Sequence, residues 1–326
     1  MSGKLVTIFG GSGFIGRYLV RHLAAQGWRV RVAVRDTAQA GFLKPAGNTG
    51  QIAMFPCSIT DEAAVARAVA GADAVVNLVG IMYERGKRSF QRIHVDGATT
   101  VAKAAAAAGV KRLLHMSALG ADQQSPSAYA RSKDAGEMAV RAAFPAATIF
   151  RPSVVFGTED GFFNLFGWMA QWFPAITFFT NSRPHSPAGG GPKFQPVYVG
   201  DVVEAMAQAL TGEGHAGKIY ELTGPRVYDM REIMHIVNRE TQRKRMVWGV
   251  PFILGEVGAM FLQFLPKPLL TPDQMKLLKL GNVATGRRPG LAVFGITPTT
   301  VEVVVPTYLK RYRPTQQTKK LRLQAR

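Results

Sequence analysis

Cysteine and histidine are scarce in this sequence of 326 residues. The single cysteine, Cys57, excludes an internal disulfide framework and a metal cluster built on cysteine thiolates. The six histidines are scattered along the chain, so no metal site is predicted. Since no disulfide can form within the chain, a reducing compartment is the simplest setting for this protein.

The sequence also has no clear signal peptide or membrane span. Its start, MSGKLVTIFGG, does not have the charged and then apolar leader that a signal peptide needs. The stretch Gly161–Ser182 carries eight aromatic rings and no formal charge, but Pro174 interrupts it, so we expect it to wall an apolar pocket. The stretch Val250–Leu270 has Glu256 and Lys267 as its charges, and it either packs within its own lobe or lies on a membrane surface or a partner. These features predict a protein of the cytoplasmic side without a transmembrane span.

Acidic residues are few compared with basic ones. There are 21 Asp and Glu against 40 Lys and Arg, which gives a formal net charge of +19 and a pI near 10.4. This balance points to an anionic neighbour such as phosphate, nucleic acid, a membrane surface or an acidic protein. Nucleic acid is not favoured, because the cations are spread along the chain and no recognition motif accompanies them. Residues Thr307–Arg326 carry seven cations and no acid, which predicts a solvated tail that anionic lipid or protein can order.

Short apolar runs alternate with helix-length stretches through the first half of the chain, which is typical of repeated β-α-β units. We therefore predict an α/β fold, a Rossmann-type doubly wound parallel sheet with a smaller C-terminal α/β lobe. The expected domains are a nucleotide-binding domain over 1–157, a smaller substrate- or partner-facing lobe over 158–306 and the basic tail over 307–326. The expected strands are Leu5–Phe9, Val30–Val34, Ile52–Phe55, Ala74–Leu78, Leu113–Met116 and Thr148–Phe150, and the expected helices are Phe14–Gln26, Asp61–Ala70, Phe90–Ala108 and Ala128–Ala143.

Four glycines stand within seven residues at the junction of the first strand and the first helix, in the stretch VTIFGGSGFIGRYLVRHL. Gly10 permits a tight turn there, and Gly13 lets backbone N–H groups approach a pyrophosphate at the positive end of the helix. Gly16 allows the helix and the strand to pack closely. This arrangement predicts a dinucleotide-binding turn.

The residue that follows the second strand indicates which dinucleotide binds. An acid at that position would bond the ribose 2′-hydroxyl of NAD, but VRVAVRD places Arg35 there. A guanidinium can pair with a 2′-phosphate, and Arg17 can supply a second positive charge or simply be a solvated helix residue. NADP(H) is therefore favoured, while Asp36 would restore an NAD-type acid if the strand ended one residue later.

The stretch HMSALGADQQSPSAYARSK carries candidate catalytic side chains. Ser117 ends a predicted strand, and Tyr129 and Lys133 are four residues apart on one face of a helix. Tyrosine acts as an acid or base near neutral pH when a nearby cation lowers its pKa, and Lys133 can fill this role. Ser117 would then hydrogen-bond the reacting oxygen.

These motifs resemble those of the short-chain dehydrogenase/reductase superfamily, in the extended or atypical branch that includes nucleotide-sugar epimerases and dehydratases. The resemblance rests on GGSGFIG, NLVG, the Ser117, Tyr129 and Lys133 set, RPSVVFG and QPVYVGDV. The sequence departs from the family pattern at Ser58, where an aspartate commonly contacts adenine, and at His94, where an asparagine often completes a catalytic tetrad. The motifs and the resemblance together imply a cofactor site of Gly10, Gly11, Ser12, Gly13, Phe14, Ile15, Gly16, Arg17, Arg35, Ser58, Asn77, Val79, Gly80, Ser117, Tyr129, Lys133, Pro152 and Ser153, with the last two approaching the nicotinamide.

Within that superfamily the sequence is most similar to the nucleotide-binding accessory subunits of respiratory complex I and their bacterial relatives. The stretches FGGSGFIGRYLVRHLAAQG, HMSALGAD, AGEMAVRAAFPAATIFRPSVVFGTEDGFFN, FQPVYVGDV and LTPDQMKLLKLGNV carry this likeness. The resemblance implies a tightly held, structural NADPH and a position where the hydrophilic arm meets the membrane, near the quinone-binding region. Complex I subunits of both arms would be the partners, with an anionic lipid surface as a further candidate. The alternative is a free-standing NADP(H)-dependent reductase, epimerase or dehydratase that uses Tyr129 and Lys133.

Overall fold

The computed structural model describes residues 3–181, 189–266 and 268–314. The chain forms two compact units, each assembled from separate segments. The first unit consists of Met1–Pro152, Val199–Leu222 and Ala284–Thr297, and the second of Ser153–Tyr198, Thr223–Val283 and Pro298–Arg326. The two units are described in turn.

The first unit is built on a seven-stranded sheet in which every pair of neighbours is parallel. The strand order is β11-β6-β5-β4-β1-β2-β3, so the winding direction reverses between β1 and β4. The strands are β1 (Leu5–Phe9), β2 (Arg29–Val34), β3 (Ile52–Pro56), β4 (Ala74–Asn77), β5 (Arg112–Met116), β6 (Thr148–Pro152) and β11 (Ile219–Leu222). This arrangement confirms the predicted doubly wound fold, and ligands of such sheets bind where the winding reverses, at the carboxyl ends of the strands.

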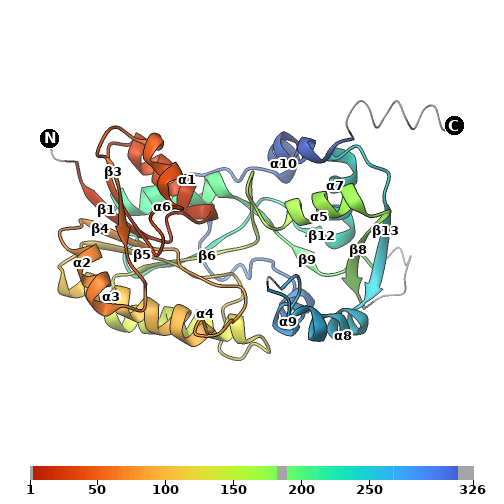
Figure 1. Cartoon of the computed structure of the whole chain (residues 1–326), viewed down its shortest axis with the longest axis horizontal. Helices are drawn as coiled ribbons and strands as arrows, with labels where there is room; N and C mark the ends of the chain where they lie inside the picture. Colours follow the sequence, from red (N-terminus) through yellow and green to blue (C-terminus); the bar gives the residue numbers. More distant parts are fainter. Residues whose placement is uncertain (1–2, 182–188, 267, 315–326) are drawn as a thin grey trace. The chain divides into compact units, whose positions relative to one another are not determined.

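Helices cover both faces of this sheet. Figure 1 shows α1 and α6 on one face and α2, α3 and α4 on the other. Their bounds are α1 (Phe14–Ala25), α2 (Glu62–Val69), α3 (Gly97–Ala107), α4 (Ala128–Ala143) and α6 (Val199–Thr211), with short 3₁₀ segments at Gly41–Ala46 (η1) and Leu291–Phe294 (η3).

The helix predicted over Phe90–Ala108 differs from the prediction. Its first part is a π-helical segment, η2 (Gln91–Asp96), and the regular helix α3 begins at Gly97. The backbone of η2 presses against α4, because a Cβ at Gly136 would overlap the carbonyl oxygen of His94. The wider π turn brings the chain against α4 at this point, and π turns commonly mark functional sites.

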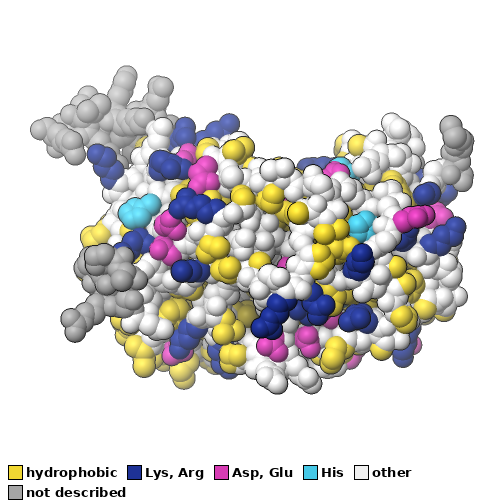
Figure 2. Space-filling view, turned by 180° about the vertical axis from the view of Figure 1, so that it is seen from behind, with side chains coloured by type: hydrophobic (Ala, Val, Ile, Leu, Met, Phe, Trp, Pro, Cys, Tyr) yellow, Lys and Arg dark blue, Asp and Glu magenta, His cyan; other side chains and the backbone are white. Residues whose placement is uncertain are grey.

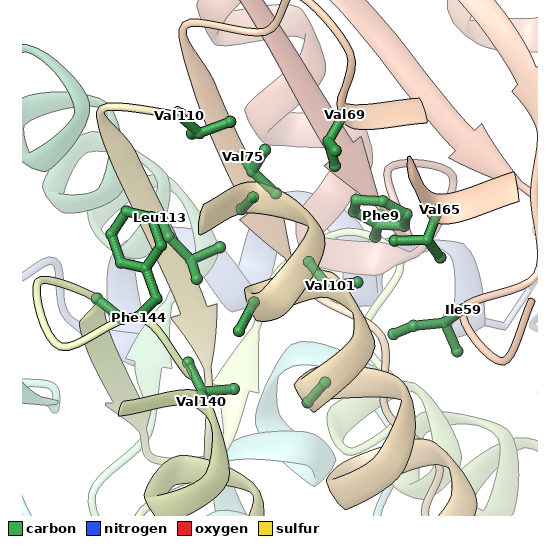
Figure 3. Close-up of a cluster of buried hydrophobic side chains, with 14 of the residues drawn as sticks. Phe9, Ile59, Val65, Val69, Val75, Val101, Val110, Leu113, Val140 and Phe144 are labelled. Atoms are coloured by element: carbon green, nitrogen blue, oxygen red, sulfur yellow. The ribbon is translucent and has the colours of Figure 1, made fainter. Parts of the chain in front are cut away.

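The core between the sheet and helices α2, α3 and α4 is aliphatic (Figure 3). Val75 and Leu113 project from the sheet, and Val65 and Val101 from the helices, with Phe9 at the end of β1. The alanine run of α3 contributes small buried side chains, so this helix packs close to its neighbours. The sheet that carries the candidate residues is thus held in a rigid support.

The second unit has an aromatic core instead. The side chains of Phe156, Phe163, Phe178 and Tyr228 are at most 2% exposed and pack together with those of helices α5, α7 and α10. Its strands are β7 (Val155–Phe156), β8 (Ala175–Thr180), β9 (Lys193–Phe194), β10 (Val197–Tyr198), β12 (Tyr228–Asp229) and β13 (Met246–Pro251), and its helices are α5 (Phe163–Trp172), α7 (Met230–Glu240), α8 (Phe252–Leu262), α9 (Pro272–Leu280) and α10 (Val301–Leu309), followed by the 3₁₀ segment η4 (Lys310–Tyr312). The strands pair two by two, as β7 with β10, β9 with β12 and β8 with β13.

Three predicted segments can now be placed. The aromatic stretch Gly161–Ser182 forms α5 and β8, and in the described part of the chain no helix is long and apolar enough to cross a membrane. The stretch Val250–Leu270 ends β13 and forms α8. The prediction of a solvated tail from Thr307 was wrong for its first residues, because α10 and η4 extend to Tyr312 and the side chains of Tyr308 and Leu309 are buried. Residues 315–326 of the predicted tail lie outside the described residues. The division into functional domains at 157 and 306 stays a prediction, since compactness does not test what each part does.

Candidate functional site

The glycine-rich turn joins β1 to α1 at the point where the sheet reverses its winding. Gly10 has a left-handed φ of 77°, which favours glycine, and its carbonyl oxygen accepts a hydrogen bond from the N–H of Gly13 at 3.0 Å. A Cβ at Gly16 would overlap the carbonyl oxygen of Gly10 and the Cα of Gly11, so the helix can approach the turn this closely because residue 16 is glycine. No side chain caps the N-terminus of α1, whereas Asp61 and Ser127 cap α2 and α4. The first N–H groups of α1 are thus presented at the carboxyl edge of the sheet.

Two arginines lie at this end of the sheet. Arg35 is exposed and directly follows β2, which ends at Val34 as predicted. The carboxylate of Asp36 accepts hydrogen bonds from the N–H groups of Ala38 and Gln39, at 3.0 and 3.1 Å, and so belongs to a local turn. The Arg17 guanidinium donates to the carbonyl oxygen of Gly13 at 3.3 Å, and it lies over a phenylalanine ring of η1, that of Phe42.

The residues after β4 form the other wall of the turn. Asn77, the last residue of β4, is buried, and its Oδ1 accepts a hydrogen bond from the N–H of Val79 at 3.1 Å. A Cβ at Gly10 would lie 3.3 Å from the backbone nitrogen of Val79, which places the two loops against each other. Gly80 is exposed beside them, and Ser58, two residues beyond β3, shares a hydrogen bond of 3.0 Å with the hydroxyl of Thr60.

Ser117 directly follows β5, and Tyr129 and Lys133 lie on α4. The Lys133 ammonium is buried and donates to the carbonyl oxygen of Met116 at 2.7 Å, next to Ser117 in the chain. The hydroxyl oxygen of Ser117 is buried, and it is the one such side-chain atom in the described residues for which the protein supplies no hydrogen-bond partner. Because leaving a buried hydroxyl unpaired is costly, this atom is suited to an external hydrogen-bonding group.

A hydrogen-bonded chain of groups runs from the loop after β4 to Tyr129. His94 Nε2 accepts from the N–H of Ile81 at 3.0 Å, which leaves the proton on Nδ1 to be donated to the hydroxyl of Ser132 at 2.8 Å. That hydroxyl donates in turn to the carbonyl oxygen of Tyr129 at 2.7 Å. The His94 ring also stacks on Phe90 and meets the Tyr129 ring edge-on, with centroids 5.3 and 5.5 Å apart. His94 is therefore held as a neutral ring, and its contacts position Tyr129.

Burial shifts the ionisation of these groups away from their usual range. Burial lowers the pKa of His94 to about 3, with the nearby Lys133 charge adding to the effect. It lowers the pKa of Lys133 to about 8, although Glu137 one turn away favours the charged ammonium. Burial also raises the pKa of Tyr129 to about 12. The expectation that Lys133 lowers the pKa of Tyr129 is thus not met in the isolated chain, where the ammonium is bound to the Met116 carbonyl.

The chain matches the model of the "NAD dependent epimerase/dehydratase family" over residues 6–223. It belongs to this family. The match begins in β1 and ends just beyond β11, so it spans the whole seven-stranded sheet of the first unit.

Three known proteins illustrate what this chain is similar to. The mouse protein "NADH dehydrogenase [ubiquinone] 1 alpha subcomplex subunit 9, mitochondrial" is 33% identical over 315 residues, 96% of this chain and 81% of its own length. "Ceramide reductase" of Caulobacter vibrioides is 40% identical over 156 residues, 48% of each chain. The Escherichia coli NADPH-dependent quinone oxidoreductase QOR2, solved with NADPH, has a TM-score of 0.71 at 20% identity and covers 93% of this chain and 99% of its own, which shows a shared fold. Homologues of this family member thus include a subunit of respiratory complex I.

The residues present fit the dinucleotide that such a Rossmann family binds. The cradle at Gly10 and Gly16 would be filled by any side chain, the N-terminus of α1 has no side-chain cap, and Ser117 presents an unpaired hydroxyl. The predicted pair Pro152 and Ser153 falls at the end of the first unit and the start of the second. Pro152 ends β6, while the Ser153 hydroxyl donates to Asn282 Oδ1 at 2.6 Å within the second unit. The role of each of these residues toward a cofactor stays a prediction.

Two groups of this site were missed from the sequence. The buried carboxylate of Glu137 accepts hydrogen bonds from both Nε and Nη2 of Arg151, each at 2.8 Å. Tyr129, Lys133 and Glu137 recur every four residues on α4, a spacing that could have placed Glu137 on the same face. Ser132, the link between His94 and Tyr129, gives no such signal because its partner lies 38 residues away.

Proposed function

We propose that this chain is an NADP(H)-binding accessory subunit of a bacterial NADH:ubiquinone oxidoreductase, attached at the cytoplasmic face of the membrane. The observation that carries the proposal is the extent of the likeness to the mouse complex I subunit. That likeness covers 96% of the chain and so takes in the second unit as well, whereas the family model stops at residue 223. The likeness to the Caulobacter reductase covers 48% of the chain.

The nucleotide would be held as part of the structure. A ligand that binds only the native state stabilises it by mass action, by about 4 kcal/mol at a thousandfold excess over its Kd. The N-terminus of α1 would hold the pyrophosphate, and Asn77 would keep the loop with Val79 and Gly80 in place beside it.

Preference for NADP(H) is supported by the end of β2. Arg35 is exposed there, and the neighbouring carboxylate of Asp36 is occupied by the backbone of its own turn. A guanidinium at this position can form two charge-assisted hydrogen bonds with a 2′-phosphate, which a ribose hydroxyl does not offer.

The second candidate function is a free-standing NADP(H)-dependent oxidoreductase, favoured by the unpaired hydroxyl of Ser117 and by Lys133, which donates to the carbonyl oxygen of the preceding residue, Met116. A bound nicotinamide would supply or accept hydride. In that case Ser117 would hold the oxygen of the carbonyl or alcohol, and the Tyr129 hydroxyl would give or take its proton. Replacing Tyr129 with Phe should then abolish turnover of carbonyl substrates and leave nucleotide affinity within about twofold, because the ring contacts to His94 and Phe90 remain.

The deciding experiment is affinity purification of the tagged chain from gently solubilised membranes of its host. Mass spectrometry of the proteins and of released nucleotide is read from the same sample. Core complex I subunits together with NADPH are the expected result. Recovery of the chain alone from the soluble fraction would reject the accessory role and favour the enzyme.

Nucleotide choice is tested separately, by the shift in melting temperature that NADPH and NADH each cause in the purified chain. The Arg35→Gln variant should lose about tenfold in affinity for NADPH and little for NADH, since it removes charged hydrogen bonds to one phosphate. Arg21→Gln, an exposed arginine on α1, is the matched control. Equal affinity of the wild-type chain for both nucleotides would refute the NADP(H) preference.

A further inference from the structure

Helix α8 of the second unit is apolar on its outer face. Its inner side chains, Phe252 and Ala259, are buried against Phe179 and the α9 residue Met275. The outward side chains, 50% to 72% exposed, are Ile253, Leu254, Val257, Met260 and Phe261. A helix on the surface of a water-soluble protein carries polar residues on its outer side, and a helix that is apolar all round is normally buried.

The exposed residues form one continuous face. At 3.6 residues per turn, those five side chains fall within an arc of roughly 120°, and no polar residue stands inside this arc. The chain continues the face after the helix, where Phe264 is 82% exposed, followed by Leu265 at 42%. We call the seven residues the α8 face.

The apolar surface extends back along β13. Met246 and Trp248 alternate outward on this strand, at 55% and 40% exposure. Trp172 and Phe173, at the end of α5, are also exposed. They shortly precede Ala175, which pairs with Met246 at the start of β13. Figure 2 shows hydrophobic side chains along the lower edge of this unit, the edge at which Figure 1 places α8.

Charge on this surface favours an anionic partner. From Met246 to Leu265 the one charged residue is Glu256, and its carboxylate is paired with the Lys279 ammonium of α9. Immediately before β13, Lys244 is exposed, whereas Arg243 and Arg245 donate to the carbonyl oxygens of Tyr312 and Ala170 within this unit. The surface therefore combines an apolar helix with an exposed lysine before β13, and its one acid, Glu256, is paired with Lys279.

A lipid bilayer fits this surface better than a protein does. Protein interfaces carry about one hydrogen bond per 100–200 Å² and a polar rim, which give them their specificity. Ile, Leu, Val, Met and Phe on the α8 face offer no hydrogen-bonding group. The acyl region of a bilayer needs none, and tryptophans are favoured at the headgroup level.

We propose that the α8 face inserts into the acyl boundary of an anionic bilayer, with the exposed Lys244 ammonium attracted to its headgroups. The inference deepens the membrane attachment of the proposed function by naming the surface and the lipid charge. Membrane insertion of the α8 face requires neither nucleotide nor complex I, so this inference and the proposed function can fail separately.

The test is flotation of the purified full-length chain with phosphatidylcholine vesicles and with vesicles of equal parts phosphatidylcholine and phosphatidylglycerol. The wild-type chain should float with the anionic vesicles, less so at high salt because the charge contribution is screened. The double variant Phe261→Glu/Phe264→Glu should bind at least about tenfold more weakly, since two large apolar side chains no longer enter the bilayer. Val303→Glu, which replaces a 66% exposed apolar residue of α10, is the matched control and should bind like the wild type.

Melting temperatures of all variants establish that they are folded. The proposal is overturned if the wild-type chain floats with neither vesicle type, or if the double variant floats as well as the wild type. It is also overturned if the double variant loses co-purifying membrane proteins while the wild-type chain ignores the vesicles, because the α8 face is then a protein interface.

Discussion

The first unit covers its apolar side chains, and the second leaves many of its own in contact with water. Among the described residues, the exposed large hydrophobic side chains of the first unit are Phe42, Met82, Met138 and Val293. All the others belong to the second unit and concentrate on α5, β13 and α8.

Buried polar groups are also used differently in the two units. In the first unit His94, Lys133 and Ser117 are buried, and the hydroxyl oxygen of Ser117 has no hydrogen-bond partner among the described residues. In the second unit the buried carboxylate of Asp160 is satisfied by the N–H of Phe163 and the hydroxyl of Tyr308, so it holds α5 and α10 together. In the functions proposed above, the interior of the first unit recognises a small ligand and the surface of the second unit binds a large partner.

A large effect on stability is expected at the buried ion pair of the first unit. Glu137→Gln should destabilise the protein by about 3 kcal/mol, because Arg151 is left without the carboxylate that binds two of its nitrogens. Chemical denaturation measures the change. Arg226→Gln in the second unit, which removes an exposed pair with Glu232, should cost at most about 1 kcal/mol. Equal losses of unfolding free energy in the two variants would contradict this difference between the buried and the exposed ion pair.

Next in size is the effect of a side chain at Gly16. Gly16→Ala forces a methyl group against the backbone of Gly10 and Gly11, so we expect a loss of about 1–3 kcal/mol and of nucleotide binding. Denaturation and nucleotide-dependent thermal shift are the two readouts. Gly41→Ala meets open space and should change stability by less than about 0.5 kcal/mol. A stable Gly16→Ala variant that still binds nucleotide would contradict the role given to this contact.

Acid should weaken the protein through His94. Its pKa is about 3 in the folded chain and 6.5 in the reference state, so the unfolded chain binds more protons and stability falls as pH drops below 6.5. At pH 5 the loss from this ring is roughly 2 kcal/mol. His94→Gln should reduce the stability difference between pH 7 and pH 5 by roughly that amount, with His115, also buried, leaving a residual dependence.

Denaturant midpoints at the two pH values provide the measurement for His94. The control is His235→Gln, at an exposed position of the second unit. An unchanged dependence in His94→Gln would mean that the buried ring does not govern acid sensitivity.

The smallest effect is expected on the α8 face. Phe264→Ala should change the free energy of unfolding by less than about 0.5 kcal/mol, because this side chain is 82% exposed. In the first unit, Phe9→Ala should cost about 3–5 kcal/mol, since that ring is 1% exposed. Differential scanning calorimetry would detect the contrast, and a large loss for Phe264→Ala would show that the ring is packed in solution.

Local sequence pattern was enough to predict the sheet and the tight glycine-rich turn between β1 and α1. Strand β1 and helix α4 have the predicted bounds, because an apolar run after polar residues and the cap at Ser127 are both visible in sequence. The spacing of the glycines predicted the roles of Gly10 and Gly16, because the turn requires glycine where the strand and the helix come into contact.

Contacts between distant residues could not be predicted in this way. The link from His94 through Ser132 to Tyr129, and the wide turn of η2 against Gly136, depend on how two helices meet. The outward direction of Ile253 and Phe261 was also undecided, because an apolar composition alone does not tell a buried helix from an exposed one.

The sheet of the first unit ends with a strand made late in synthesis. Strand β11 pairs with β6, and the ring of Phe294 packs on Tyr220 and Phe150, with centroids 4.8 and 6.2 Å away. After β6 has left the ribosome, translation must therefore continue through Leu222 before β11 can pair with it, and on to Phe294, on the order of ten seconds in all, before this ring can pack on them. During that interval the open edge of β6 is accessible first and the nascent apolar helix α8 later, so a chaperone that shields apolar segments should raise the yield of folded chain.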